Sequence, residues 1–592
     1  MTTDTTRRSI ARRLATGALL ALALHWPGAS RAAGCSIDRL ELPVKIVGTR
    51  AIATVGINGA SVPLLVDSGA FFSFLTEAAA QQLKLRTRPL PASIQPQGLT
   101  GGIDARLTTV DHLQLVSGEL KAMDFIVGGN DDVSGAMGLL GSNILGSADA
   151  EYDLAHGMIR LIVPSADCAH ANMAYWAGDT PVSMLDLIKD DRFRNPAIRA
   201  TAKLDGHDVV ALFDTGATTA VSLHAARSAG VKDAAMTPTE RMSGAGHGEV
   251  DAWTAPFDNV SLGNETVSHN RLQVGAFDKD DFDMLVGIDF FLSHRIYVSR
   301  QQSRMFFTYG GGPVFALNKG APPAAAASGV PADDLAADEL ARRGAVSLAR
   351  NDAAAALVDL DRACTLQPGN ASFFVTRAHA HQALKQDDAA LADFDTALRL
   401  DPAQADARIW RAVVHRNRNE RDAVLADLSV LDASLPAQSN IRRNMALLYD
   451  SLDMPTQAIT QWTHWIAAHR HDALLAEASN GRCWARAELG IELDKAMDDC
   501  DEAVDADRRN AAYLDSRAWV FVRIGHWHRA ELEFDRAIAA KPDLAPSLYG
   551  RALVHQHLDE PAMADADLAA ARKASPSIDA DIARFGLPTV KQ

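Results

Sequence analysis

Two patterns of hydrophobic and polar residues divide the chain. Between residues 38 and 310, short runs rich in Val, Ile, Leu and Phe are broken by Gly, Asn and Asp. Short apolar runs separated by turn residues predict an all-β fold. From about residue 338, small and large apolar residues recur in the same order every 34 residues. A period of 34 residues is typical of stacked helix–turn–helix repeats, so we expect an all-α region after the β region.

The β region contains one pattern twice. The stretch AIATVGINGASVPLLVDSGA at residues 51–70 returns as AIRATAKLDGHDVVALFDTGA at residues 197–217. Residues 137–163 return as residues 283–309, and a glycine cluster lies between the two stretches in each copy. Three features in one order, at offsets of 147 and 146 residues, predict a duplicated β domain. We assign a signal peptide to 1–34, lobe 1 to 38–165, a connection to 166–189, lobe 2 to 190–312, a Pro-, Ala- and Gly-rich linker to 313–335 and the repeats to 336–580.

The helical repeats number about seven, with one insertion of four residues. Pro368, Pro402 and Pro436 are 34 residues apart, and so are Pro542 and Pro576. Alanine and phenylalanine occupy matching positions in different units, and Cys500 falls in a phenylalanine position that we expect to be in the core. This part of the chain resembles the tetratricopeptide repeat (TPR) family. The resemblance implies an α-solenoid whose concave surface binds a protein or peptide partner.

Composition narrows the function classes. The formal net charge of −16 argues against a nucleic-acid-binding surface, which would normally be basic. No segment has some 18 uninterrupted apolar residues, so no membrane span is expected. Arginines near the N-terminus, an apolar stretch at residues 14–26 and small residues after it predict an export signal cut after Ala32. We therefore expect a periplasmic or secreted protein; a lipid anchor at Cys35 is the alternative interpretation of the same segment.

Cysteines are few for an exported chain of 592 residues, five in all. Cys35 and Cys168 bracket lobe 1, so that a disulfide between them is one option. In the repeats, Cys364, Cys483 and Cys500 are interpreted as buried free thiols, with a Cys483–Cys500 bond as the alternative. No cysteine has metal-ligand spacing with a histidine, and we expect no metal and no cofactor.

The candidate chemistry lies at two aspartates. Asp67 and Asp214 each end an apolar run and are followed at once by a hydroxyl residue and a glycine. Such triplets also occur in ordinary turns. Here each is followed about 73 residues later by two apolar residues and a glycine, Leu139–Gly141 and Leu285–Gly287. The repetition of both elements favours two halves of one active site.

These motifs resemble the retropepsin-like aspartic proteases, whose signature is D-[ST]-G-A. The resemblance covers about 270 residues and implies two acid-protease lobes with Asp67 and Asp214 facing each other. It further implies that Ser68 and Thr215 hydrogen-bond across the interface and that Gly69 and Gly216 let backbone N–H groups approach the carboxylates. The glycine clusters stand where the family has its flaps, which makes flap candidates of Gly101, Gly102, Gly244 and Gly246.

Two carboxylates about 3 Å apart share a proton, and such a pair can activate water against a peptide bond without metal or covalent intermediate. The sequence therefore predicts an exported aspartic endopeptidase with a protein-binding TPR array. One alternative is a non-catalytic peptide-binding scaffold built from the same parts. Another is pairing of each lobe with its counterpart in a second chain.

Other chemistries lack support in the sequence. There is no HExxH and no GxSxG motif, and the histidines form no recognisable cluster. His247 is expected to be solvent-exposed. Asp281, Asp283 and Asp289 do not have calcium-loop spacing and are interpreted as a solvated turn. The FFSFL segment after the first triplet is bulkier than the family pattern, and the first flap candidate has no Tyr or Trp.

Overall fold

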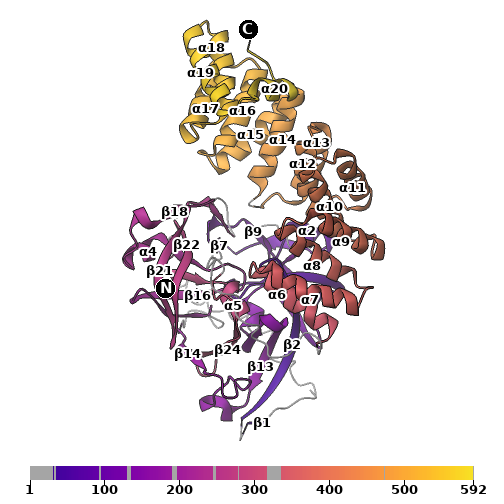
Figure 1. The fold of residues 1–592 in the computed structure, drawn as a ribbon. Helices are drawn as coiled ribbons and strands as arrows, with labels where there is room; N and C mark the ends of the chain where they lie inside the picture. Colours follow the sequence, from indigo (N-terminus) through magenta and orange to yellow (C-terminus); the bar gives the residue numbers. More distant parts are fainter. Residues whose placement is uncertain are drawn as a thin grey trace. The chain divides into compact units, whose positions relative to one another are not determined.

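A computed structural model describes residues 31–32, 35–91, 95–129, 135–189, 197–244, 249–277, 279, 281–315, 335–472 and 474–590. The chain forms two compact units, residues 1–407 and 408–592. The first holds both β lobes and the first helical repeats, and the second holds the later repeats (Figure 1). The predicted signal peptide apart from residues 31–32, Gly246, His247 and most of the predicted linker lie outside the described residues.

Lobe 1 is built around a closed ring of six strands. In order around the ring they are β3 (Arg50–Ile57), β4 (Ala60–Val66), β11 (Gly138–Leu140), β5 (Phe74–Leu75), β10 (Gly118–Gly128) and β9 (Ala105–Leu115). Pairing of β9 with β3 closes the ring. Strand β6 (Thr87–Pro89) adds to β9, and two short helices, α2 (Glu77–Gln82) and α3 (Ser142–Leu145), complete the lobe.

Lobe 2 repeats this ring strand for strand. Its members are β15 (Arg199–Leu204), β16 (His207–Phe213), β23 (Met284–Val286), β17 (Ala220–Ser222), β22 (Glu265–Gly275) and β21 (Ala252–Leu262), closed by β15 on β21. Strand β18 (Thr237–Pro238) and helices α4 (Leu223–Ser228) and α5 (Ile288–Ser293) correspond to β6, α2 and α3. The two rings confirm the predicted all-β duplication.

Equivalent turn residues start both rings. Asn58 and Gly59 connect β3 to β4 with φ values of 49° and 88°, and Asp205 and Gly206 connect β15 to β16 with 48° and 87°. Both residues of such a two-residue hairpin need positive φ, which Asn, Asp and Gly adopt most readily. The two copies therefore form the same hairpin, and each hairpin leads its second strand into a DSG or DTG triplet.

A sheet shared by the lobes joins them within one chain. Its order is β14 (Ser183–Asp186), β25 (Arg304–Tyr309), β24 (His294–Ser299), β12 (Asp149–Asp153), β13 (Met158–Pro164) and β2 (Cys35–Val47). Strand β12 of lobe 1 pairs antiparallel with β24 of lobe 2. The central strands are buried on both faces, so the junction between the lobes is part of the hydrophobic core.

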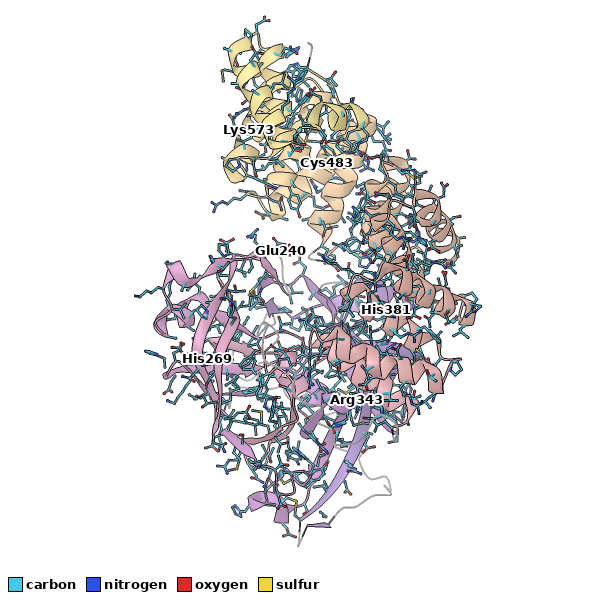
Figure 2. The ribbon with its side chains drawn as sticks, viewed as in Figure 1. Glu240, His269, Arg343, His381, Cys483 and Lys573 are labelled. Carbon is cyan, nitrogen blue, oxygen red and sulfur yellow. A yellow bond between two sulfur atoms is a disulfide. The ribbon has the colours of Figure 1, made fainter. Side chains whose placement is uncertain are left out.

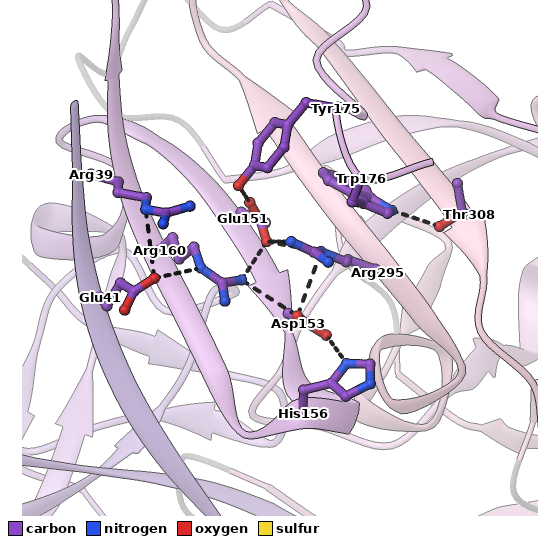
Figure 3. A network of polar contacts seen from close by, with 10 residues as sticks. All are labelled: Arg39, Glu41, Glu151, Asp153, His156, Arg160, Tyr175, Trp176, Arg295 and Thr308. Carbon is purple, nitrogen blue, oxygen red and sulfur yellow. Dashed lines mark hydrogen bonds and ion pairs between the residues drawn. The ribbon is translucent and has the colours of Figure 1, made fainter. Parts of the chain in front are cut away.

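An ion network crosses this junction (Figure 3). Glu151 on β12 is fully buried, and its Oε1 accepts hydrogen bonds from Arg160 of lobe 1 at 2.5 Å and from Arg295 of lobe 2 at 2.9 Å. The Tyr175 hydroxyl donates to its other oxygen. The Arg295 guanidinium also lies 4.5 Å from the ring centre of Trp176. One carboxylate thus holds cations from both lobes.

Fifteen helices, α6 to α20, follow among the described residues from 335 onward, and the first fourteen form seven pairs. Alanine and aromatic side chains such as Ala390 and Phe394 fill the space between paired helices. In several pairs an arginine of one helix binds an aspartate sixteen residues later, as in Arg343–Asp359. This is the predicted TPR-type repeat. The helices are α6 Ala337–Ala349, α7 Ala353–Leu366, α8 Ala371–Ala383, α9 Asp387–Leu400, α10 Ala405–Asn417, α11 Arg421–Ser434, α12 Ile441–Ser451, α13 Pro455–Ala468, α14 Leu475–Leu489, α15 Leu493–Ala506, α16 Ala511–Arg523, α17 Trp527–Ala540, α18 Ala545–His557, α19 Pro561–Ala574 and α20 Ile578–Arg584.

Four of the five cysteines are paired. Cys35 at the start of β2 is bonded to Cys168, one of the options in the sequence. Cys483 on α14 is bonded to Cys500 on α15, so the interpretation of these two as free thiols is wrong, and only Cys364 is a buried free thiol (Figure 2). The expected core position of Cys500 and this bond agree, because adjacent core positions of paired helices face each other. No helix among the described residues has the length and apolar character needed to cross a membrane.

Candidate active site

The two aspartates occupy equivalent positions at the ends of equivalent strands. Asp67 follows β4 and its N–H donates to Leu140 O at 3.0 Å; Asp214 follows β16 and its N–H donates to Val286 O at 2.9 Å. The apolar-apolar-glycine elements therefore run beside the strands that end at the aspartates. This parallel pairing is the reason for two motifs about 73 residues apart in each lobe.

The hydroxyl residues bridge the lobes in a reciprocal set of four hydrogen bonds. Ser68 N donates to Thr215 Oγ1 and Thr215 N donates to Ser68 Oγ, both at 3.0 Å. In turn Ser68 Oγ donates to Phe213 O at 2.9 Å, and Thr215 Oγ1 donates to Val66 O at 2.8 Å. Both hydroxyls are fully buried. Each hydroxyl therefore acts as donor and acceptor, and the two loops are held in one mutual orientation.

The glycines after the hydroxyl residues leave no room for a side chain. A Cβ on Gly69 would lie 2.4 Å from Asp214 Cγ, and a Cβ on Gly216 would lie 2.6 Å from Asp67 Cγ. The Gly216 N–H donates to Asp214 Oδ1 at 2.7 Å, and the Ala70 N–H donates to Asp67 Oδ1 at 2.6 Å. Each glycine is thus required because its backbone passes directly over the carboxyl group of the other lobe.

Adding a methyl group here tests this packing. We expect Gly69→Ala to lower the free energy of unfolding of the β lobes by about 1–3 kcal/mol, because the Asp214 carboxyl and the lobe interface must move to make room. Thermal and urea unfolding of the purified chain measures the loss. Gly369→Ala is the control, since a Cβ there meets nothing within 4 Å. Equal stability of Gly69→Ala and the parent would contradict the close approach.

Electrostatics make the two carboxyls unequal. They share a hydrogen bond with each other, and both keep some solvent exposure. Burial, together with the charge of Asp214, raises the pKa of Asp67 well above its ordinary value. Burial also raises the pKa of Asp214, but the Gly216 N–H and the positive charge of Arg50 oppose that rise. The shared proton is therefore expected on Asp67 and the negative charge on Asp214.

Arg50 is a site residue that the sequence reasoning did not identify. It begins β3 of lobe 1, and its Nη1 donates to Gly216 O of lobe 2 at 2.8 Å. The offset of 147 residues places Ala197 at the corresponding position of lobe 2. Comparison of the two copies at this position would have revealed an arginine without a counterpart. The arrangement of the dyad is thus duplicated, whereas its charge environment is not.

One further side-chain hydrogen bond in each lobe holds the loop that follows the DSG or DTG triplet. Ser73 Oγ donates to Asn143 Oδ1 at 2.7 Å in lobe 1, and Thr219 Oγ1 donates to Asp289 Oδ1 at 2.6 Å in lobe 2. Asp289 is buried, so the interpretation of this residue as part of a solvated turn is wrong; Thr219 supplies the hydrogen bonds that make its burial tolerable. Asp281 is exposed, as expected, and Asp283 accepts a hydrogen bond from Val210 N.

The bulky FFSFL segment at residues 71–75 keeps the hydrogen bonds that the corresponding loop of lobe 2 makes. The Phe71 and Phe72 rings pack edge to face, 4.7 Å apart, and are partly buried. The neighbouring Gly141 N–H donates to Ser73 Oγ at 2.9 Å, just as Gly287 N–H donates to Thr219 Oγ1 in lobe 2. Ser73 thus corresponds to Thr219, and Phe71 and Phe72 stand where lobe 2 has the single residue Thr218, so the longer and bulkier segment leaves the hydrogen bonds around the loop unchanged.

The flap candidates lie on two short hairpins. Gly101 and Gly102 form β8 (Gly101–Gly102), which pairs with β7 (Gln97–Gly98), and Gly244 follows β19 (Met242–Ser243), which pairs with β20 (Glu249–Val250). Thr100 Oγ1 donates to Gly244 O at 3.3 Å, so the hairpins of the two lobes touch. Lys279 of lobe 2 also donates to Gly98 O at 2.7 Å.

Side chains that could bind a metal ion lie close together in the later helical repeats rather than at the aspartate pair. Among the residues described, the group of His and carboxylate side chains with such spacing is Glu531, His555 and Glu560 in the later repeats. The dyad itself consists of two carboxyls that bond to each other and to backbone N–H groups. Its composition suits proton transfer.

Comparison with known families agrees with this geometry. Residues 53–147 match the model described as gag-polyprotein putative aspartyl protease, and residues 200–290 match the model described as aspartyl protease. Each match contains one dyad aspartate and its apolar-apolar-glycine element. The N-terminal half therefore carries two aspartyl protease domains, ahead of a TPR-type repeat array. A search of curated proteins finds no match.

Several solved structures similar to this chain are described as TPR proteins. The TPR protein YrrB, described as having an unusual peptide-binding site, is 19% identical over 32% of this chain and 97% of its own, with a TM-score of 0.29. A TPR protein from Parabacteroides merdae is 16% identical over 42% of this chain and 98% of its own, with a TM-score of 0.33. MamA is 14% identical over 34% of this chain and 95% of its own, with a TM-score of 0.21.

Proposed function

We propose that this chain is an exported aspartic endopeptidase whose helical repeats bind a protein substrate or partner. The observation that carries the proposal is the hydrogen-bonded pair of Asp67 and Asp214, held between two lobes by the Ser68–Thr215 exchange. Two matching protease domains on one chain support the same conclusion. The repeat fold supports a protein-binding role for the helical part by its architecture.

In the proposed reaction the two carboxyls have different tasks. Asp214, favoured as the ionised member, takes a proton from a water, and the water oxygen attacks the peptide carbonyl carbon. Asp67, favoured as the protonated member, donates its proton to the carbonyl oxygen. As the C–N bond breaks, Asp214 gives its proton to the leaving nitrogen and Asp67 takes one back from a hydroxyl of the tetrahedral intermediate, which restores the starting pair and releases the carboxylic acid. The backbone N–H groups of Ala70 and Gly216 hold the carboxyls in place throughout.

Arg50 gives this assignment a pH test. Its positive charge favours the singly ionised pair, so Arg50→Gln is expected to move the acidic limb of the kcat/KM profile upward by about half to one pH unit. Arg50→Lys, which keeps the charge, should restore most of the original midpoint. Arg88→Gln removes an exposed cation of the same lobe and should leave the limb in place. A loss of activity in Arg50→Gln with an unmoved limb would limit Arg50 to supporting the Gly216 loop.

Export is supported by two features. The N-terminal segment has the basic, apolar and small-residue order of a secretion signal. The two disulfides, Cys35–Cys168 and Cys483–Cys500, persist in oxidising compartments and are rare in the reducing cytosol. Cell fractionation of the full-length chain, with N-terminal sequencing of the mature form, tests the export proposal.

Cleavage of an unfolded protein at mildly acidic pH tests the activity. The parent chain should produce fragments, and the double variant Asp67→Asn/Asp214→Asn should not. Activity proportional to chain concentration is expected from a site built within one chain; a steeper dependence would favour pairing between chains. A parent that binds extended peptides without cleaving them would favour the alternative function, a peptide-binding scaffold.

A further inference from the structure

A buried histidine in the last repeats lacks a hydrogen-bond partner. The His555 side chain on α18 is 3% exposed. Its Nε2 lies 3.6 Å from Glu531 Oε1 and 3.9 Å from Glu560 Oε2, beyond hydrogen-bond distance. Its Nδ1 lies 3.2 Å from Asp567 Oδ2 but is not aligned to donate, and among the described residues it has no hydrogen-bond partner. Buried polar groups are normally satisfied, and a ligand bound at Nε2 that turned Nδ1 onto Asp567 would satisfy both ring nitrogens.

In two other repeats the histidine at the same position has a hydrogen-bond partner within its own unit. His381 and His415 occupy the same place in earlier units and bond through Nδ1 to the residue five positions later, Gln386 at 2.7 Å and Glu420 at 2.5 Å. In the last repeats the corresponding Glu560 stands away from the ring. A second carboxylate is also added there, because Glu531 occupies the position that is leucine in the earlier units, at residues 357 and 391.

The three side chains have the composition and spacing of metal ligands. The ligand atoms of Glu531, His555 and Glu560 all lie within 4.8 Å of one another. Bonds of about 2.0–2.2 Å to a tetrahedral ion place ligand atoms roughly 3.5 Å apart, close to the observed spacing. Two carboxylates balance the charge of a divalent cation, and imidazole favours zinc-type ions over calcium and magnesium.

The surroundings supply what such a site needs beyond three ligands. His528 lies one helical turn before Glu531 on α17, with its Nδ1 3.6 Å from Glu531 Oε2, and its exposed ring can turn to provide a fourth ligand. A small rotation of the ring on metal binding would align Nδ1 of His555 to donate to Asp567 Oδ2, now 3.2 Å away, and such an acceptor is the usual outer partner of a metal-bound histidine. Asp567 is itself held by two hydrogen bonds from Arg551, at 2.7 and 2.8 Å.

We propose that Glu531, His555 and Glu560, with His528 as the fourth ligand, bind a zinc-type divalent cation. The ligands come from α17, from α18 and from the residue before α19, so the ion ties together helices of two successive repeats. Its role is structural: it closes the last repeats of the array and satisfies the buried imidazole. The site is independent of the aspartate pair.

Metal titration of the full chain tests the proposal. The untagged protein is treated with chelator, dialysed and titrated with Zn²⁺ by calorimetry and with Co²⁺ by visible absorption. We expect about one ion per chain, the absorption bands of tetrahedral Co²⁺, and a higher midpoint of helix unfolding with Zn²⁺ than without. His555→Gln should weaken binding at least about 100-fold, and Glu560→Gln and His528→Gln about tenfold each.

Two matched variants separate the site from general effects. His415→Gln changes the same repeat position where the ring is already hydrogen-bonded, and His557→Gln removes a ring that stacks on Trp527, 3.8 Å away. Both should bind Zn²⁺ and Co²⁺ as the parent does. Absence of binding by the parent, an octahedral Co²⁺ spectrum, or equal affinity in His555→Gln and the parent would overturn the proposal. None of these readouts depends on proteolytic activity.

Discussion

Asp67→Asn and Asp214→Asn are each expected to lower kcat/KM for peptide cleavage by about 10³- to 10⁴-fold. Each removes one of the two proton-transfer groups, and neither remaining carboxyl can serve as acid and base in one step. Because the pair acts as a unit, the double variant should lose little more than either single one. Initial rates on an unfolded substrate across the acidic pH range measure the effect.

The same variants should stay folded, which separates catalysis from stability. Burial raises the pKa of both aspartates, so ionisation at neutral pH opposes folding; this destabilisation is absent below the ordinary value of 3.8 and grows as the pH rises through the raised values. Neutral asparagine removes it. At pH 7 each variant should therefore unfold at a temperature equal to or above that of the parent.

Asp208→Asn is the matched control for these variants. Asp208 lies on β16, six residues before Asp214, but its side chain is 66% exposed and pairs with Lys203. Activity and stability should both stay at the parent level. Cleavage by Asp67→Asn or Asp214→Asn at the rate of the parent would contradict the shared-site mechanism, and unfolding of either variant at pH 7 would contradict the electrostatic account.

Glu151→Ala is expected to have the largest effect on stability, about 3–5 kcal/mol. Glu151 is completely buried and binds Arg160 and Arg295, so its removal leaves these cations from different lobes with only the longer contacts to Asp153, at 3.4 and 3.5 Å, as a shared anion (Figure 3). Native-state hydrogen exchange is the suitable measurement, because it reports on the junction between the lobes separately from the helices. Protection of the β12 and β24 amides should fall by about two to four orders of magnitude.

Glu41→Gln is the control for the network. Glu41 also accepts a hydrogen bond from Arg160, at 3.1 Å, but its side chain is 45% exposed. Exposed ion pairs contribute at most about 1 kcal/mol, so exchange at β12 and β24 should change less than tenfold. If Glu151→Ala changed exchange as little as Glu41→Gln, the network would not hold the lobes together.

The features that could be predicted from the sequence are those that a short motif or an internal repetition of the chain encodes. The duplicated motifs at Asp67 and Asp214 predicted two similar lobes, and the structure places the two carboxyls together. The period of 34 predicted the helix pairs, because each unit carries its own core residues. Both kinds of signal lie within a single lobe or repeat.

Features that depend on the approach of distant segments could not be predicted. Arg50 reaches Gly216 across 166 residues, and Arg295 reaches Glu151 across 144, so each contact depends on how the lobes pair. The sequence shows no cluster around His555, because only the packing of α17 against α18 brings this histidine beside Glu531. An aspartate near a turn is usually solvated, so the burial of Asp289 could not be predicted; it depends on the hydrogen bond from Thr219.

The contrast between Arg50 and Ala197 affects the orientation in which a peptide substrate binds. A peptide has a chemical direction, from its amino end to its carboxyl end. A symmetric pair of identical subunits presents the same walls to both orientations. In this chain one half contributes an arginine and two phenylalanines where the other contributes an alanine and one threonine, Thr218. The two orientations of a bound peptide are therefore inequivalent, and a duplicated chain can select one of them.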